Sequence, residues 1–202
     1  MKKILLICFF IVAAFAVYFF IDNEQNIAFL SSEESERVES QVSEIKRITE
    51  SNSKYNKEIA FLIDMKIPSG KNRFFVYDLK TNKILDQGLV AHGSGSETGI
   101  KGKLKFSNIP NSFSTSLGQY SIGNHYMGKF GKAYKLYGLD DTNNNAFKRD
   151  IVFHYYYDVP YKEKDGYICN SQGCPMVNKK YFDRLAKIID SSKSEIVMSI
   201  YY

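Results

Sequence analysis

Cys174 is the side chain in this sequence best suited to covalent chemistry. It lies in segment 170–175, which reads NSQGCP, so that a glycine precedes it and a proline follows. A cysteine acts as a nucleophile through its thiolate, which is favoured near the start of a helix such as the one expected just downstream. Gly173 allows a tight turn that brings backbone amides close to the sulfur, which is what an oxyanion pocket requires.

His154 is the candidate base for this thiol. It ends an apolar run twenty residues before Cys174, and imidazole is the side chain best suited to accept a thiol proton near neutral pH. A small buried cysteine and a hydrogen-bonded structural histidine would give the same spacing. The residues alone therefore leave both a reactive pair and an inert pair open.

The two other histidines have less defined roles. His92, just before Gly93, either lines a substrate groove, acts as the base in place of His154, or supports the site from behind. His125 lies in a glycine-rich loop and is expected to be scaffold. The three cysteines show no paired zinc-ribbon spacing, so no metal site is expected.

Arg149 and Asn145 suit a carboxylate clamp, because a guanidinium binds carboxylates through two parallel hydrogen bonds. A structural ion pair of Arg149 with Asp150 or Asp141 is the alternative.

Cys169 lies five positions before Cys174. An oxidising compartment favours disulfides, and two cysteines can be bridged only if their α-carbons come within about 7 Å. Either Cys169 is a packing residue that never bonds to Cys174, or the two form a reversible latch that silences the nucleophile.

The elements that must position these residues are mostly strands. Short β-branched and aromatic runs occur from residue 59 onward, and glycines interrupt the middle of the chain. Helical periodicity returns only at 178–190, after the cysteine. The sequence predicts a mainly β fold, a closed or sandwiched sheet with one helix near its end. The expected strands are 59–64, 73–78, 84–85, 89–92, 134–137, 150–154 and 195–201.

The chain divides into three parts. Residues 1–21 hold two lysines and an uncharged apolar run from Ile4 to Ile21, which predicts a signal peptide or an uncleaved membrane anchor and hence export to the cell envelope. Residues 22–58 are polar, with a capping box at Ser31 and Glu34 and one amphipathic helix at about 32–50, a spacer or docking element. Residues 59–202 form the catalytic domain.

Composition excludes several classes of protein. With 44% hydrophobic and 24% charged residues the chain is globular rather than disordered. The net charge of +5 is mild, so no nucleic-acid partner is expected. Residues 22–60 carry nine acidic and five basic residues, which leaves the rest of the chain basic and suited to anionic partners.

The cysteine motif resembles that of the YkuD-type L,D-transpeptidases, enzymes of bacterial cell-wall peptidoglycan, and most closely the murein L,D-transpeptidase catalytic-domain-like branch. Seven segments between about 60 and 202 carry the resemblance in the same order. They are 90–93 (VAHG), 106–108 (FSN), 116–120 (SLGQY), 136–139 (LYGL), 145–146 with Arg149, 151–154 (IVFH) and 171–175 (SQGCP). The resemblance implies an L,D-transpeptidase-like β-sandwich or barrel with one helix after the catalytic cysteine.

In the implied reaction His154 deprotonates Cys174, and the thiolate attacks the carbonyl of the bond that joins the terminal D-alanine to the rest of a tetrapeptide stem. An amine of a second stem then resolves the thioester into a 3→3 crosslink, whereas water would make the enzyme an L,D-carboxypeptidase. Attachment of a protein or amino acid, and an inactive wall-binding module, are further alternatives. The reaction needs no cofactor, and carbapenem β-lactams are expected inhibitors.

The resemblance also implies roles for the remaining residues. Gly173 and Cys174 would supply oxyanion amides, and Ser171 would orient the loop or His154. Substrate-binding residues would be His92, Gln172, Asn145, Arg149 and Tyr120.

Three positions depart from the broader YkuD pattern. Tyr155 stands where glycine commonly follows the histidine, Gln172 where a histidine precedes the Gly-Cys, and Pro175 where an arginine follows it. The proline belongs to the closer branch. These differences affect substrate specificity more than the chemistry.

Overall fold

The computed structural model describes residues 30–202. The expected signal or anchor segment, 1–21, lies outside these residues. Between residues 30 and 202, no helix has both the length and the apolar character needed to cross a membrane.

Within residues 30–202, nine strands form one sheet, with order β3-β2-β1-β9-β5-β6-β7-β8-β4. The helices are α2 (Ser32–Ser51), the short 3-10 turn η1 (Ser94–Ser96) and α3 (Lys179–Ser191). The strands are β1 (Tyr55–Asp64), β2 (Phe74–Asp78), β3 (Lys83–Gly88), β4 (Val90–Ala91), β5 (Gly118–Gly128), β6 (Gly131–Gly138), β7 (Val152–Tyr155), β8 (Met176–Val177) and β9 (Glu195–Tyr201). The expected mainly β fold with a helix after the cysteine is confirmed. In detail, the described strands make a single open sheet with β3 and β4 as its edges.

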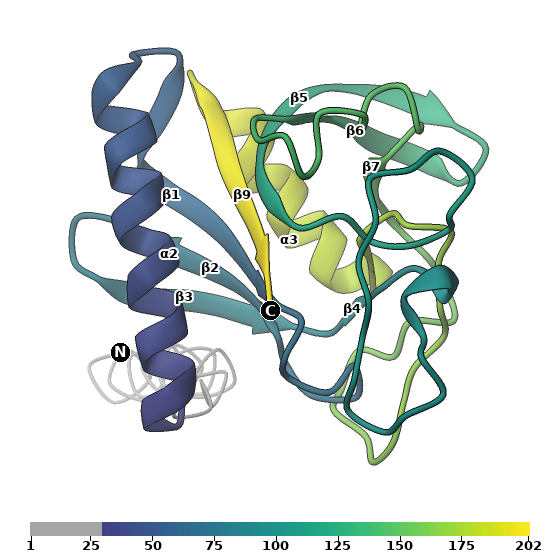
Figure 1. Ribbon diagram of the computed structural model, residues 1–202. Coiled ribbons are helices and arrows are strands. Elements are labelled where there is room, and N and C mark those ends of the chain that lie inside the picture. Colours follow the sequence, from purple (N-terminus) through teal and green to yellow (C-terminus); the bar gives the residue numbers. More distant parts are fainter. Residues whose placement is uncertain (1–29) are drawn as a thin grey trace, which may run out of the picture.

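The two long helices cover opposite faces of this sheet (Figure 1). Side chains alternate between faces along a strand, and on β1 Phe61 and Ile63 pack in the cluster that includes α3, whereas Ala60 and Leu62 pack in the cluster that includes α2. The sheet is therefore the middle layer between two apolar cores.

Helix α2 is docked on the sheet rather than extended away from it. The capping box at Ser31 and Glu34 is present, and Val38, Val42 and Ile45 are buried. An ion pair between Arg37 and the buried Asp64, with nitrogen and oxygen 2.8 Å apart, adds a polar contact. The helix expected at about 32–50 is confirmed. Of its two expected roles, spacer or docking element, the packing on the sheet fits the docking element.

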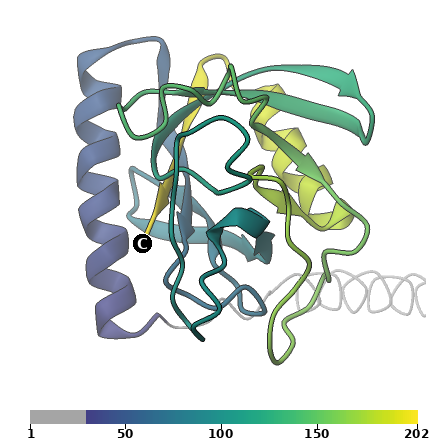
Figure 2. The ribbon, with the colours of Figure 1, turned by 45° about the vertical axis from the view of Figure 1, so that its right-hand side comes forward.

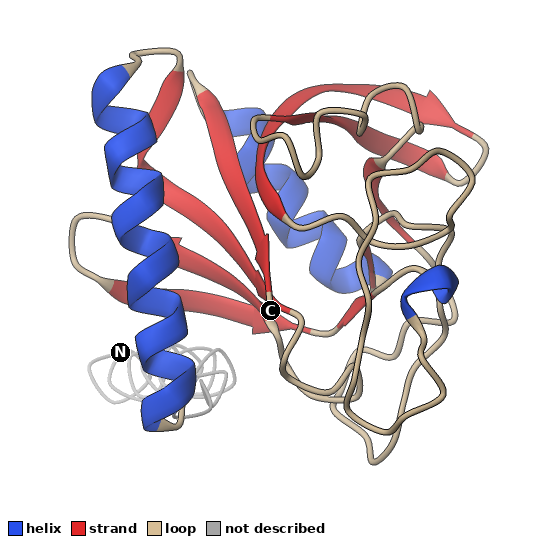
Figure 3. Cartoon of the chain, viewed as in Figure 1, coloured by secondary structure: helices blue, strands red, loops and turns tan. Residues whose placement is uncertain are grey.

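Strand β5 was not expected as one element, because the glycines of the middle region favour interruption. It nevertheless pairs with both β6 and β9. The segments between β4 and β5 and between β7 and α3 are largely irregular, and Figure 3 shows their loops gathered on the side of the molecule away from α2. Cys174, Ser171 and His92 lie in these loops or next to them, His154 lies in β7, Asn145 and Arg149 lie in the connection between β6 and β7, and Tyr120 lies in β5.

Candidate active site

Cys174 lies in a tight loop that leads into β8. Gly173 before it has φ of +116°, a backbone conformation that favours glycine. An added Cβ at Gly173 would lie 2.9 Å from the Ser114 carbonyl oxygen. Strand β8 separates the cysteine from α3, and the side chain of Asn178 accepts the Lys180 amide at the start of that helix. The loop, rather than the helix terminus, thus fixes the cysteine.

The Cys174 thiol is half-buried and contacts backbone groups. The Val152 amide donates to Sγ at 3.4 Å, and Sγ donates to the Asp150 carbonyl at 3.6 Å. Burial raises the pKa of the Cys174 thiol, while the Val152 amide and the Arg149 guanidinium oppose that rise. The resting residue is therefore a neutral thiol at neutral pH, in need of a base.

Among residues 30–202, Nε2 of His154 has no hydrogen-bond partner and can act as that base. Nδ1 lies 2.9 Å from the Tyr155 carbonyl oxygen, which can only accept, so Nδ1 carries the proton of the neutral ring and Nε2 carries the lone pair. Burial lowers the pKa of His154, although the Tyr155 carbonyl opposes this. The Phe130 ring stacks on the imidazole with centroids 5.5 Å apart and planes at 16°. His154 is consequently a neutral base held in one tautomer.

Strands β7 and β8 bring the two candidate catalytic residues onto neighbouring segments. They pair in parallel, with His154 opposite Met176, two residues beyond Cys174. Within the described chain no hydrogen bond joins Cys174 to His154, since Sγ is turned toward the backbone at 150–152. Catalytic hydrogen bonds are often long in unliganded enzymes and tighten when substrate binds.

Ser171 fixes the loop around the nucleophile. Its amide donates to the His92 carbonyl and its own carbonyl accepts from the Ser94 amide, each at 2.8 Å. Its Oγ accepts the Gly173 amide at 3.0 Å. The Gly173 amide, expected as an oxyanion donor, is thus occupied by Ser171 here. Within residues 30–202 the Cys174 amide has no hydrogen-bond partner and remains available for that role.

His92 is not free to accept a proton from Cys174. Its Nδ1 accepts from Arg73 Nη2 at 2.9 Å, and its Nε2 donates to Glu97 Oε1 at 2.7 Å. Burial and the neighbouring Arg73 charge lower the pKa of His92, and Glu97 opposes them. The ring is 2% exposed, so in this structure His92 supports the loop from behind.

Arg149 and Asn145 bind protein groups. The Arg149 guanidinium donates to the carbonyls of Ser107 and Ser114 at 2.9 and 2.6 Å. The Asn145 side chain donates to the Asn108 carbonyl at 3.1 Å. The two residues hold loop 107–116 against the loop before β7, and no ion pair of Arg149 occurs among the described residues. Neither expected role, carboxylate clamp or ion pair, describes these contacts.

Tyr120 and Gln172 differ sharply in accessibility. Tyr120 is fully buried, and its hydroxyl donates to the Ser116 carbonyl at 2.7 Å. Burial raises the pKa of Tyr120 to about 12. The structure therefore places Tyr120 in the core, where it cannot touch a substrate, and corrects its expected binding role. Gln172 is exposed beside the nucleophile.

Cys169 and Cys174 are both free thiols. Both pack against one small apolar cluster that includes Leu89, Ala91 and Met176. Burial raises the pKa of the Cys169 thiol as well. Among residues 30–202 no group of three or more histidine, cysteine or acidic side chains could hold a metal ion.

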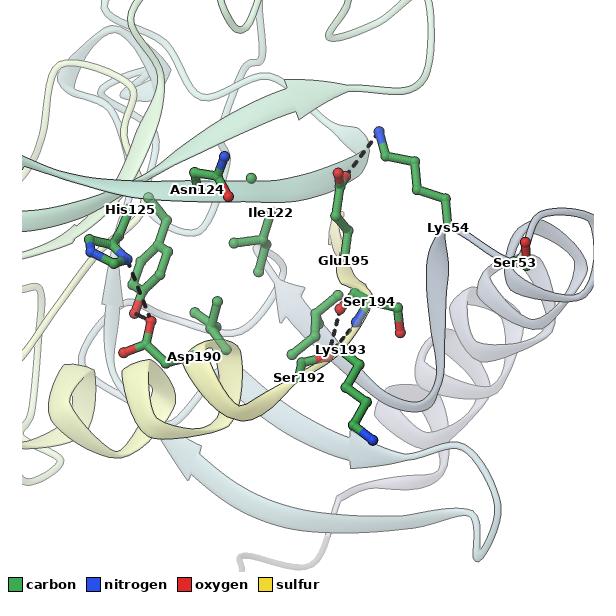
Figure 4. Close-up of a pocket in the computed structure, with 14 residues that line it drawn as sticks. Ser53, Lys54, Ile122, Asn124, His125, Asp190, Ser192, Lys193, Ser194 and Glu195 are labelled. Carbon is green, nitrogen blue, oxygen red and sulfur yellow. Dashed lines mark hydrogen bonds and ion pairs between the residues drawn. The ribbon is translucent and has the colours of Figure 1, made fainter.

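His125 lines a hollow of about 740 Å³ at the end of α3 (Figure 4). Its Nδ1 is 3.8 Å from Asp190 Oδ1, to which the Tyr134 hydroxyl also donates at 2.8 Å. Cys174 does not line this hollow. His125 thus lies on β5 beside the end of α3, away from the candidate nucleophile.

Three contributors to the site were missed in the sequence. Phe130 stacks on His154, and Arg73 and Glu97 fix His92. Arg73 stands at the head of an apolar strand and Phe130 in a turn between glycines, so neither had a local pattern that marked it. Glu97 follows His92 by five residues in a glycine-rich segment, and a single carboxylate there did not indicate that it would bind His92.

Comparisons with known proteins identify the family of the chain. A family model described as the L,D-transpeptidase catalytic domain matches residues 31–201. Similar solved structures include an L,D-transpeptidase from Xylanimonas cellulosilytica, with 13% identity, a TM-score of 0.39, and coverage of 72% of this chain and 61% of that one. Another is the helical cell shape determining protein Pgp2 from Campylobacter jejuni, with 13% identity, a TM-score of 0.44, and coverage of 71% and 47%.

The matched part of this chain thus spans about half to three fifths of those structures. No curated protein matches the chain by sequence. The family match extends over most of the chain and takes in helix α2 as well as the sheet. This chain belongs to the L,D-transpeptidase catalytic domain family.

Proposed function

We propose that the protein is a cysteine-dependent peptidoglycan L,D-transpeptidase that forms 3→3 crosslinks. Cys174 is the nucleophile and His154 the base. The observation that carries the proposal is the β7–β8 pair, which sets a histidine with a free Nε2 beside the segment of a half-buried thiol. Burial lowers the pKa of His154, which keeps its imidazole neutral, and raises the pKa of Cys174, which keeps its thiol protonated. This combination suits general-base activation, in which the imidazole removes the thiol proton as the sulfur attacks.

In the acylation step His154 Nε2 takes the thiol proton while Sγ bonds to the carbonyl carbon before the terminal D-alanine. The carbon–nitrogen bond to D-alanine breaks, and the imidazolium returns its proton to the departing amine. In this proposal the Cys174 amide, which has no hydrogen-bond partner among residues 30–202, donates to the developing oxyanion. One such donor is worth roughly 100–1,000-fold in rate.

In the second step an amine from another stem attacks the thioester. His154 accepts the amine proton and passes it to the leaving thiolate, so that the free enzyme and a new amide are formed. Water as the acceptor would release a tripeptide instead. The loop that holds Gln172 exposed beside Cys174 is the part of the site that the acceptor meets.

Mass analysis of products from tetrapeptide muropeptides tests the proposal. Crosslinked dimers support transpeptidation, and tripeptides alone would make the protein a carboxypeptidase. Unchanged muropeptides with retention on sacculi would make it a wall-binding module. Cys174→Ala should abolish turnover with folding intact, and Cys169→Ser is the matched control that keeps activity.

Two further properties belong to this proposal. Apolar residues 4–21 would direct the chain to the cell envelope, either as a cleaved signal or as a membrane anchor. Carbapenem β-lactams would acylate Cys174. An intact-mass adduct mapped to Cys174 supports the second property, and an adduct on Cys169 or none would contradict it.

A further inference from the structure

A cavity of about 270 Å³ opens close to the nucleophile loop without including it. The described residues that line it come from 65–73, from His92, from the loop 97–104 and from the turn 164–167. Figure 2 shows these segments as loops at the lower end of the molecule. Cys174 does not line this cavity.

Positive charge dominates the lining. It contains Lys66, Lys71, Arg73, Lys101, Lys103 and Lys164, against the acidic residues Glu97 and Asp165. Within residues 30–202, Lys101, Lys103 and Lys164 have no ion-pair partner, whereas Lys71 is paired with Glu163 at 3.5 Å. Three exposed lysines that line one cavity favour an anionic ligand.

The walls behind these lysines are apolar. Met65 and Ile67 are buried, and Leu104 is half-buried. Ile100 is 58% exposed and Tyr167 51% exposed, although both line the cavity. Exposed apolar side chains around a cavity are typical of a surface that binds a ligand. The walls therefore suit an apolar body, and the lysines an anionic group.

Two polar residues of the lining, His92 and Glu97, connect the cavity to the nucleophile loop. Glu97 Oε1 accepts from His92 Nε2 at 2.7 Å and from Asn170 Nδ2 at 3.4 Å. The His92 carbonyl accepts the Ser171 amide at 2.8 Å. The side chains of Arg73, His92 and Glu97 are thus already hydrogen-bonded to one another, which leaves the exposed lysines of the lining as the groups able to bind an anion.

We propose that this cavity is a binding site, separate from Cys174, for a small ligand with one carboxylate or phosphate group on an apolar body. Lys101, Lys103 and Lys164 bind the anion, and the apolar body lies against Ile67, Ile100 and Leu104. The same chemistry is offered by the free carboxyl end of a short peptide and by a phosphate ester of an alkyl chain.

Calorimetric titration of the full chain in non-ionic detergent tests the site. One probe is N-acetyl-alanyl-alanine, with its carboxy-terminal amide as the uncharged counterpart. The other is hexyl phosphate, with hexanol as its counterpart and inorganic phosphate as the ion alone. The proposal is supported if either acid binds at least about tenfold more tightly than its uncharged counterpart and if added salt weakens that binding. The acid that binds shows whether the site takes a peptide carboxylate or an alkyl phosphate.

Variants locate the binding. The double variant Lys101→Gln with Lys103→Gln should lower the affinity for the acid that binds by about tenfold. Lys57→Gln with Lys83→Gln removes the same charge from exposed positions that do not line the cavity and should leave affinity unchanged. The proposal is overturned if neither acid binds, if the uncharged counterparts bind equally well, or if both double variants lose the same affinity. These measurements need no turnover, so they stand apart from the muropeptide assay.

Discussion

Replacing Ser171 with alanine removes the side-chain acceptor that holds the Gly173 amide. The two atoms, Ser171 Oγ and Gly173 N, are 3.0 Å apart, and both residues are buried. The bonds of Ser171 to His92 and Ser94 use main-chain atoms and survive the change. The perturbation is therefore confined to one hydrogen bond next to the nucleophile.

The loss can be worked from that contact. A buried donor left without an acceptor costs about 1–3 kcal/mol. Alanine also spares the desolvation of a hydroxyl, so we expect the free energy of unfolding to fall by about 1–2 kcal/mol, which is roughly 5–30-fold in the unfolding equilibrium. A nucleophile displaced by about 1 Å can lose about 100-fold in rate, so kcat should fall by about 10–100-fold.

Urea unfolding followed by circular dichroism measures the first quantity, and timed analysis of muropeptide products measures the second. Ser53→Ala is the matched control, because Ser53 is exposed and lies in the turn after α2. Unchanged stability together with unchanged kcat would refute the idea that Ser171 fixes the loop. A higher kcat would show instead that Ser171 withholds the Gly173 amide from the oxyanion.

The remaining predictions concern the base, the thiols and the docked helix. His154→Ala should slow acylation far more than His92→Ala, because both ring nitrogens of His92 are bonded to protein groups; the reverse order in single-turnover assays would transfer the base role to His92. Burial raises the pKa of Cys174 above its ordinary value of 9.0, so its alkylation by iodoacetamide should still increase as pH rises through 9, and a plateau below pH 8 would contradict this. If Cys169 forms a latch with Cys174, dithiothreitol should raise turnover of the wild type and not of Cys169→Ser; full activity with two free thiols would exclude the latch. Ile45→Ala should lower the free energy of unfolding by about 2–5 kcal/mol in urea titrations, and a loss below 1 kcal/mol would show that α2 contributes little to the core.

Local patterns predicted the elements well. The capping box and the apolar spacing placed helix α2 within one residue of its observed end, and 178–190 matched α3 almost as closely. Both signals depend on neighbours three or four positions apart. Strand β5 was missed, since its glycines at 118, 123 and 128 suggested turns.

Long-range pairing could not be read from such patterns. The parallel pairing of β1 with β9 joins residues near 60 to residues near 200, and neither strand carries a mark of its partner. The same limit applies to the site. The motif identified Cys174 and His154 as a pair, but the contacts of Arg73 and Phe130 with the two histidines depend on how distant strands meet. Tyr120 lies in a segment that resembles the family, which suggested a role in substrate binding, but its side chain is packed in the core.

The position of β9 has a consequence for how the chain reaches this structure. Its seven residues are inserted between β1 and β5, so the strand that comes last in the chain order of this sheet joins its two halves. Until then β1 and β5 are open edges with apolar faces, and open edges pair readily with other chains. Contacts between distant segments also form slowly. A chain that stops before residue 195 should therefore aggregate rather than fold, and the full chain should pass through a slow, aggregation-prone stage that ends only when β9 pairs.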